Sequence, residues 1–148
     1  DEEIANAVLF LLEKQKLVVE GAGAAGVAAI LHHKIYPKPS DKVGIILSGG
    51  NVDVTMLNLI IEKGLIKSHR KLQFKTVLID KPGSLEKLTT ILCKAEANII
   101  KIDYNRISTT IDYGDAIITM TVETKGKEHQ NKVRESLKKA GYKIDEFD

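Results

Sequence analysis

The residues best placed to do chemistry follow one short alternating segment. Asp80, Pro82, Gly83 and Ser84 lie where that segment gives way to a helical pattern. Free amide groups and the positive end of a helix dipole attract a carboxylate at such a junction, and glycine has no side chain to block a ligand. The pattern predicts a site for a small carboxylate-bearing molecule. The alternative is a plain turn in which Asp80 or Ser84 caps the helix.

Asn98 favours the binding site over the plain turn. It lies sixteen residues after Pro82, at the start of the next predicted strand. We expect the returning chain to place its amide near the loop that holds Asp80.

A second cluster is Ser48, Gly49 and Gly50, which ends an apolar run and allows close approach to a planar ligand. A plain glycine turn after a strand is the alternative. Glu20 and Asn51 flank this cluster, either as ligand contacts or as a solvated and a helix-capping residue.

A glycine-rich run at 21–26 imitates a dinucleotide fingerprint. The next predicted strand ends without the acidic residue that holds a ribose hydroxyl. We therefore expect tight packing by small residues here and no nicotinamide cofactor.

The elements that must position Asp80 and Asn98 begin at Leu72, where apolar residues alternate. Strands and amphipathic helices then follow in the order β-α-β-β-α-β, and Gly141 is the expected cap of the second helix. This order is the ferredoxin-like arrangement, with both helices on one face of an antiparallel sheet. The other face carries an apolar patch that a second copy or the preceding domain could cover, made of Val77, Ile79, Ile99 and Ile117.

The first 70 residues have a different, α/β pattern. Helices are predicted over 3–15, 21–34 and 54–66, with a buried strand at 43–47. A single buried strand has no neighbouring strand to pair with its backbone groups, and each unpaired buried group costs about 1 to 3 kcal/mol. We expect this part to belong to a larger domain, and the helix at the very start of the chain suggests a cut from a longer protein.

Composition sets the broad class. The chain has 148 residues, 43% of them hydrophobic, with a net charge of +2 and a single cysteine. We expect a globular cytoplasmic protein with no disulfide, no membrane segment, no nucleic-acid partner and no metal, since the four histidines lack metal-ligand spacing.

The second half resembles the ACT domain family. The motifs that carry the resemblance are Asp80-Lys81-Pro82-Gly83-Ser84-Leu85 and Ala97-Asn98-Ile99, with Gly114, Glu123-Thr124 and Gly141-Tyr142 further on. The resemblance implies an amino-acid effector at a domain–domain interface, contacted by the residues matching Asp80 and Asn98.

The first half resembles the end of the catalytic domain of the threonine dehydratase family, a group of fold-type II pyridoxal-phosphate enzymes. The matching runs are 16–29, 43–53 and 60–66, and serine racemase and serine dehydratase share much of the first two. The resemblance places Ser48 against the pyridine nitrogen of the cofactor, with Gly49 and Gly50 close to its ring. The Schiff-base lysine motif and the phosphate-binding loop are not found in this sequence.

The two resemblances together imply a remnant of the catalytic domain at 1–70 and an ACT regulatory domain at 71–148. The parent enzyme would convert L-threonine to 2-oxobutanoate and ammonia with pyridoxal phosphate. This piece would be inactive, bind no cofactor alone, and sense isoleucine, or valine or threonine, as a homodimer or tetramer. The alternative is a noncatalytic oligomerisation module without a small-molecule ligand.

Overall fold

The computed structural model describes residues 1–147 of the chain. They form two compact units, Asp1–Gly64 and the part from Leu65 onward, each with its own core. The helix α3 (Val54–Lys67) crosses the boundary between them. None of the helices in the described part of the chain combines the length and apolar character needed to span a bilayer.

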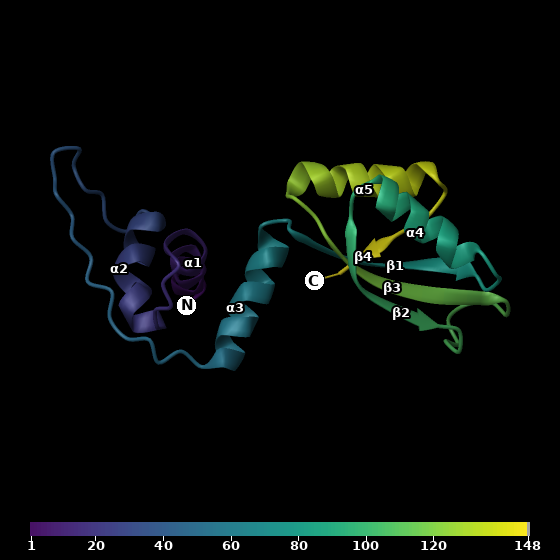
Figure 1. The fold of residues 1–148 in the computed structure, drawn as a ribbon, viewed down its shortest axis with the longest axis horizontal. Coiled ribbons are helices and arrows are strands. Elements are labelled where there is room, and N and C mark those ends of the chain that lie inside the picture. The colour runs from purple at the N-terminus through teal and green to yellow at the C-terminus, as the bar shows by residue number, and fades with distance from the viewer. Residues whose placement is uncertain (148) are drawn as a thin grey trace. The chain divides into compact units, whose positions relative to one another are not determined.

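The second unit has the predicted order of elements. Its elements are β1 (Lys71–Ile79), α4 (Ser84–Lys94), β2 (Asn98–Asn105), β3 (Asp115–Glu123), α5 (Lys127–Lys139) and β4 (Asp145–Glu146). The sheet order is β2-β3-β1-β4, and each neighbouring pair is antiparallel. Both helices lie on the same face of the sheet (Figure 1). This is the ferredoxin-like topology that the alternating pattern predicted.

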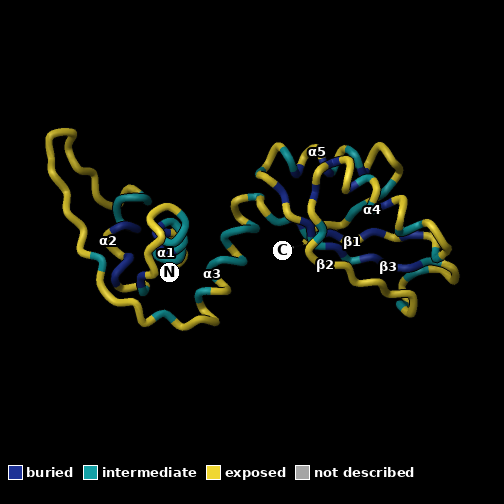
Figure 2. Tube along the Cα trace, in the orientation of Figure 1, coloured by how far each residue is buried: buried dark blue, intermediate teal, exposed yellow. Residues whose placement is uncertain are grey.

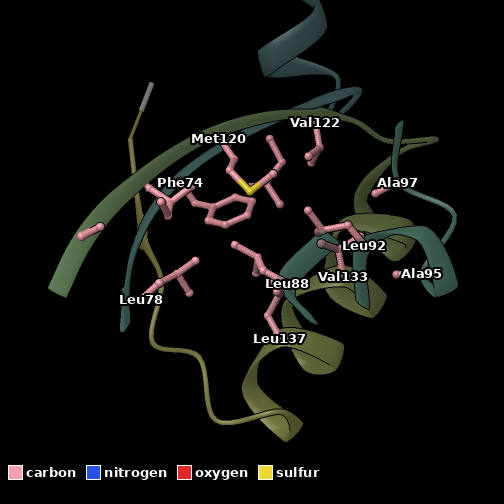
Figure 3. Packing of buried hydrophobic residues seen from close by; sticks show 13 residues of the cluster. Phe74, Leu78, Leu88, Leu92, Ala95, Ala97, Met120, Val122, Val133 and Leu137 are labelled. Atoms are coloured by element: carbon pink, nitrogen blue, oxygen red, sulfur yellow. The ribbon is translucent and has the colours of Figure 1, made fainter. Parts of the chain in front are cut away.

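The core of this unit lies between the sheet and the two helices. Phe74 and Met120 extend from the sheet toward Leu88, Leu92 and Leu137 on the helices (Figure 3). All five side chains are fully buried. Apolar residues alternate along β1 and β3, so that every second residue faces the helices, as the sequence predicted.

Two glycines shape the ends of the helices. Gly83 has φ of 85° and precedes the first residue of α4, and Gly141 has φ of 88° just after α5. Only glycine adopts this left-handed conformation at little cost. The predicted stop at Gly141 is confirmed, since its amide donates to the Lys138 carbonyl at 3.0 Å.

The last strand is shorter than the predicted segment 142–147, because only Asp145 and Glu146 pair with β1. The residues before β4 are held differently. The Thr76 hydroxyl donates to the Lys143 carbonyl at 2.7 Å, which fixes this segment against β1 without a second ladder.

One residue of the predicted apolar patch does not lie on the uncovered face of the sheet. Val77 and Ile79 are 49% and 59% exposed, as predicted, and Val77 lies opposite Ile117. Ile99, in contrast, pairs with the buried Val122 and so faces the helices. A bulge at Ile100 shifts the register of β2, and the sequence pattern gives no sign of it.

The first unit is helical. Helix α1 (Glu2–Phe10) continues into a π-helical turn (Leu11–Gln15), and α2 (Gly21–Leu31) packs against α1. Buried side chains of this unit come from these helices and from Val19.

The predicted buried strand at 43–47 is wrong. Asp1–Gly64, all of which the structure describes, contains no strand. Val43 and Ile46 are 53% and 89% exposed, and Figure 2 shows the surrounding segment as exposed. The physical reason is the one that made a lone strand costly: no neighbouring strand is present to pair with its backbone.

Candidate functional site

The first part of the candidate site lies at the end of β1. The Asp80 amide donates to the Gly114 carbonyl at 2.7 Å, which fixes the backbone between two loops. Its carboxylate Oδ1 accepts hydrogen bonds from the Tyr104 hydroxyl at 2.8 Å and from Arg106 Nη2 at 2.9 Å. The Asp80 side chain is 23% exposed and that of Arg106 is 64% exposed. Strand β2 and the residues after it therefore hold an anionic group in place at the surface.

The same contact acts on the tyrosine. The hydrogen bond to Asp80 raises the pKa of the Tyr104 hydroxyl above its ordinary value, and partial desolvation adds to this. Tyr104 therefore stays a neutral donor at physiological pH, and Arg106 lies over its ring with 5.9 Å from the guanidinium carbon to the ring centroid.

The start of α4 lies beside Asp80 in the chain. Gly83 is the N-cap residue, and no side chain caps this helix. The alternative in which Asp80 or Ser84 caps the helix is therefore wrong, because the Asp80 carboxylate is bound by Tyr104 and Arg106. A Cβ atom added to Gly83 would meet nothing within 4 Å, so the space next to the helix start is open. Lys81 and Pro82 are also exposed there.

Asn98 lies at the other end of the sheet. It pairs with Glu123, and its side-chain amide donates to Glu123 Oε2 at 2.8 Å. Glu123 in turn lies opposite Lys71, the first residue of β1, whereas Asp80 follows the last. At about 3.3 Å per residue, the length of β1 separates the two side chains by roughly 25 Å.

The predicted convergence of Asp80 and Asn98 within one chain is therefore wrong. The reason is the direction of α4, which carries the chain back along β1 before β2 begins. Asn98 does begin the next strand, as predicted. One copy of the chain can bring only one of these side chains to a given ligand.

Sequence reasoning missed Tyr104 and Arg106 as neighbours of Asp80. Tyr104 lies near the far end of β2 and Arg106 follows that strand, and alternation already placed Tyr104 on β2. The missing information was the pairing order, because β3 lies between β1 and β2. In a split βαβ unit β1 and β2 run parallel, so their carboxyl ends lie at the same end of the sheet. This rule predicts that Tyr104 and Arg106 lie near Asp80.

The second cluster, at Ser48, lies in an exposed connection of the first unit. Gly49 has φ of 75°, and the Glu20 side chain occupies the space where a Cβ atom would be. The Glu20 amide donates to the Gly49 carbonyl at 3.0 Å. The Ser48 carbonyl fills the space at Gly23, so the small residues of α2 serve close packing, as expected.

The residues that the sequence places near a pyridoxal-phosphate ring all lie in this segment of the first unit. Ser48, Gly49 and Gly50 are exposed, and the Glu20 side chain occupies the space beside Gly49. Capping of α3, one role considered for Asn51, falls to Asp53, whose carboxylate accepts from the Thr55 amide at 2.7 Å. We derive no chemical step from this cluster. Among residues 1–147, no three side chains of His, Cys, Asp or Glu are grouped to hold a metal ion.

Comparisons with known proteins cover nearly the whole chain. No family model matches it. An L-threonine ammonia-lyase of Thermotoga maritima is 44% identical over 144 residues, which is 97% of this chain and 35% of that protein. An L-threonine ammonia-lyase of Geobacter sulfurreducens is 41% identical, over 98% of this chain and 36% of that protein.

A catabolic L-threonine dehydratase of Staphylococcus aureus matches a smaller part, with 45% identity over 44% of this chain and 19% of its own length. Among solved structures, prephenate dehydratase of Streptococcus mutans has a TM-score of 0.44 at 19% identity, covering 51% of this chain and 40% of its own. The ACT domain of a GTP pyrophosphokinase of Chlorobium tepidum has a TM-score of 0.41 at 18% identity, covering 52% of this chain and 96% of its own. The chain is a relative of L-threonine ammonia-lyases, similar to them over nearly all of its own length and spanning about a third of theirs.

Proposed function

We propose that this chain is the regulatory part of a longer L-threonine ammonia-lyase that converts L-threonine to 2-oxobutanoate and ammonia. Residues 71–148 are the ACT regulatory domain, and residues 1–70 are the end of a pyridoxal-phosphate catalytic domain. The similarity to two L-threonine ammonia-lyases, over 97% and 98% of this chain, supports both assignments. The chain alone is inactive in this proposal, because the sequence offers no Schiff-base lysine motif and no phosphate loop.

The proposed effector is an α-amino acid, and the observation that carries this is the fixed carboxylate of Asp80 beside the start of α4. Asp80 offers an anionic acceptor for an ammonium group. The helix start offers amide groups and a positive dipole end for a carboxylate, with open space at Gly83. An α-amino acid carries both of these groups on one carbon. Isoleucine is the effector we propose from the resemblance, with valine or threonine as the alternatives.

Asn98 contributes to this site from a second copy of the chain. It lies roughly a strand length away from Asp80 in its own copy. Two copies related by a two-fold axis can bring the Asp80 end of one sheet to the Asn98 end of the other. The proposal therefore requires a homodimer, or a tetramer built from such dimers.

A noncatalytic oligomerisation module is the second candidate. The exposed apolar side chains of Val77 and Ile79 favour it, since they need a partner but no ligand. Binding of an amino acid separates the two candidates.

Calorimetry of this chain against the twenty amino acids tests the proposal. We expect saturable binding of one branched or hydroxylated aliphatic amino acid. Asn98→Ala should weaken that binding by about 1 to 3 kcal/mol through lost hydrogen bonds. Asn58→Ala, an exposed asparagine on α3, is the matched control and should leave it unchanged.

Gly83→Leu tests the approach to the helix start. The side chain would enter the open space there and should abolish binding. Because Gly83 has positive φ, this variant also loses about 1 kcal/mol of stability, and circular dichroism must show that it remains folded. Absence of binding by all twenty amino acids to the folded wild-type chain would leave only the oligomerisation module.

A further inference from the structure

The backbone just after α3 is held in a conformation that few residues adopt. His69 has φ of 57°, in the left-handed region, and its amide donates to the Ile66 carbonyl at 2.9 Å. The Arg70 amide donates to the Leu65 carbonyl at 2.8 Å. This pair of hydrogen bonds is the Schellman ending of a helix, in which glycine is the usual left-handed residue. A histidine there costs stability, so neighbouring groups must hold it in place.

Three consecutive carbonyl groups after α3 accept hydrogen bonds from residues 124–130 of the same unit. The Thr124 hydroxyl donates to the His69 carbonyl at 2.7 Å, and the Thr124 amide donates to the Arg70 carbonyl at 2.9 Å. Gln130 Nε2 donates to the Lys71 carbonyl at 3.0 Å. Thr124 and Gln130 are only 8% and 2% exposed, so water competes little for these hydrogen bonds. We call residues 69–71 the junction segment.

The residue before Thr124 connects this arrangement to Asn98. Glu123 Oε2 accepts a hydrogen bond from the Asn98 side-chain amide at 2.8 Å. In the sheet, Glu123 lies between Asn98 and Lys71 and pairs with both. A displacement of Glu123 therefore reaches the junction segment by two routes, along the chain to Thr124 and across the strand pair to Lys71.

We propose that Thr124 is a positioning residue that couples Asn98 to the junction segment, and through that segment to the end of α3. The proposal rests on the proposed function, in which Asn98 contacts the amino-acid effector. A bound amino acid orders the Asn98 side chain and strengthens its hydrogen bond to Glu123. Thr124 then holds His69 more firmly in its left-handed conformation. Occupancy of the effector site thereby changes the stability of the segment that joins α3 to β1.

Hydrogen exchange of the full 148-residue chain, without any amino acid present, tests the role of Thr124. The reporter is the Arg70 amide, whose hydrogen bond to Leu65 breaks when the junction segment opens. Thr124→Val keeps the shape and removes the hydroxyl donor, and should accelerate this exchange about tenfold. Thr124→Ser keeps the hydroxyl and should stay within about threefold of the wild type. Thr89→Val is the matched control, because its hydroxyl donates to the Leu85 carbonyl within α4, and it should leave the reporter unchanged.

The amides of α4 show whether the effect of Thr124→Val is local. They should exchange as slowly as in the wild type, because α4 makes no part of the junction segment. Unchanged exchange at Arg70, or the same acceleration throughout α4, would overturn the proposal by showing no role or a merely structural one.

A double-mutant cycle tests the coupling to Asn98. Asn98→Ala removes the hydrogen bond to Glu123 and should accelerate exchange of the Arg70 amide at least about threefold. In the Thr124→Val background the same change should add less than about 1.5-fold, because the contact that transmits it is already lost. No acceleration by Asn98→Ala, or the full acceleration in both backgrounds, would overturn the coupling.

Failure of the proposed function is seen separately by calorimetry. A chain that shows this coupling and binds none of the twenty amino acids would refute the proposed function and leave the coupling standing. A chain that binds an amino acid without the coupling would refute only this inference.

Discussion

The ion pair between Arg134 and Glu146 predicts a pH-dependent stability that can be worked out from its geometry. Arg134 on α5 donates from Nε to Glu146 Oε1 at 2.6 Å and from Nη2 to Oε2 at 2.8 Å. The pair is bidentate and joins the last helix to β4, which pairs with β1 through only two residues. The side chains are 32% and 37% exposed, so solvent screens the interaction. We expect it to contribute about 0.5 to 1 kcal/mol, the upper range for a surface pair.

The pH at which this contribution disappears follows from the carboxylate. The hydrogen bonds from Arg134 lower the pKa of Glu146 below its ordinary value, against a smaller opposing effect of desolvation. A lowered pKa in the folded state means that the stabilisation is complete above the ordinary glutamate pKa. It is lost as the pH falls through the folded value. Arg134 stays charged throughout, because the same contact raises its already high pKa.

Glu146→Gln removes the charge and keeps the shape, and urea unfolding at pH 7 and pH 3 measures the effect. At pH 7 the variant should lose about 0.5 to 1 kcal/mol of unfolding free energy. At pH 3 the difference from wild type should shrink. Glu135→Gln is the control, because its pair with Lys139 is 3.8 Å long and highly exposed, and we expect no measurable change. An equal loss at both pH values would show that the charge of Glu146 is not the cause, and no loss at pH 7 would refute the reasoning altogether.

Three further predictions concern the core, the contacts of one histidine and the proposed remnant of a catalytic domain. Leu88→Ala, at a fully buried position of α4, should lower the unfolding free energy by roughly 3 to 5 kcal/mol in urea, and a loss below about 1 kcal/mol would contradict the packing. His129→Ala should lower the unfolding free energy in urea by about 1 to 2 kcal/mol, since the ring accepts from the Lys125 amide at 3.0 Å and contacts the Ala95 carbonyl at 2.7 Å; an unchanged value would contradict these contacts. Mixing the chain with pyridoxal phosphate and L-threonine should give no 2-oxobutanoate and no stoichiometric absorbing adduct, and turnover with one defined lysine modified would contradict the proposal.

The sheet and helices of the second unit could be predicted from the sequence because their pattern is local. Ile118, Met120 and Val122 alternate with half-exposed residues, and this alternation alone fixes which side of β3 is buried. The bulge at Ile100 could not be predicted, because it depends on how β2 meets β3 and not on any residue type. Because of this extra residue, Ile99 lies on the face of the sheet that the helices cover, and not on the uncovered face that the sequence predicted.

The predicted strand at 43–47 failed for a related reason. Its five apolar residues have the composition of a strand that is buried on both faces. A strand also needs neighbours, and none are present within residues 1–64. The exposed side chains of Val43 and Ile46 support the proposal that this unit continues a larger catalytic domain.

The sequence predicted candidate residues for the site, but it did not predict which of them lie close together. Asp80 and Gly83 lie together at the start of α4, as the turn motif predicted. The position of Asn98 required the direction of α4 along the sheet, and the roles of Tyr104 and Arg106 required the strand order. Local motifs therefore gave the candidate residues, and the topology decides which of them lie close together.

The central claim is that two copies share one effector site, with Asp80 from one and Asn98 from the other. Calorimetry of mixed variants tests it most directly. Asp80→Ala and Asn98→Ala chains should each bind the effector poorly when alone. Mixed in equal amounts and allowed to exchange, half of the dimers combine one chain of each kind and contain one intact site. We therefore expect about a quarter of the wild-type binding capacity to return. If the mixture binds no better than its separate components while wild-type binding is intact, the two residues do not act across copies and the claim is contradicted.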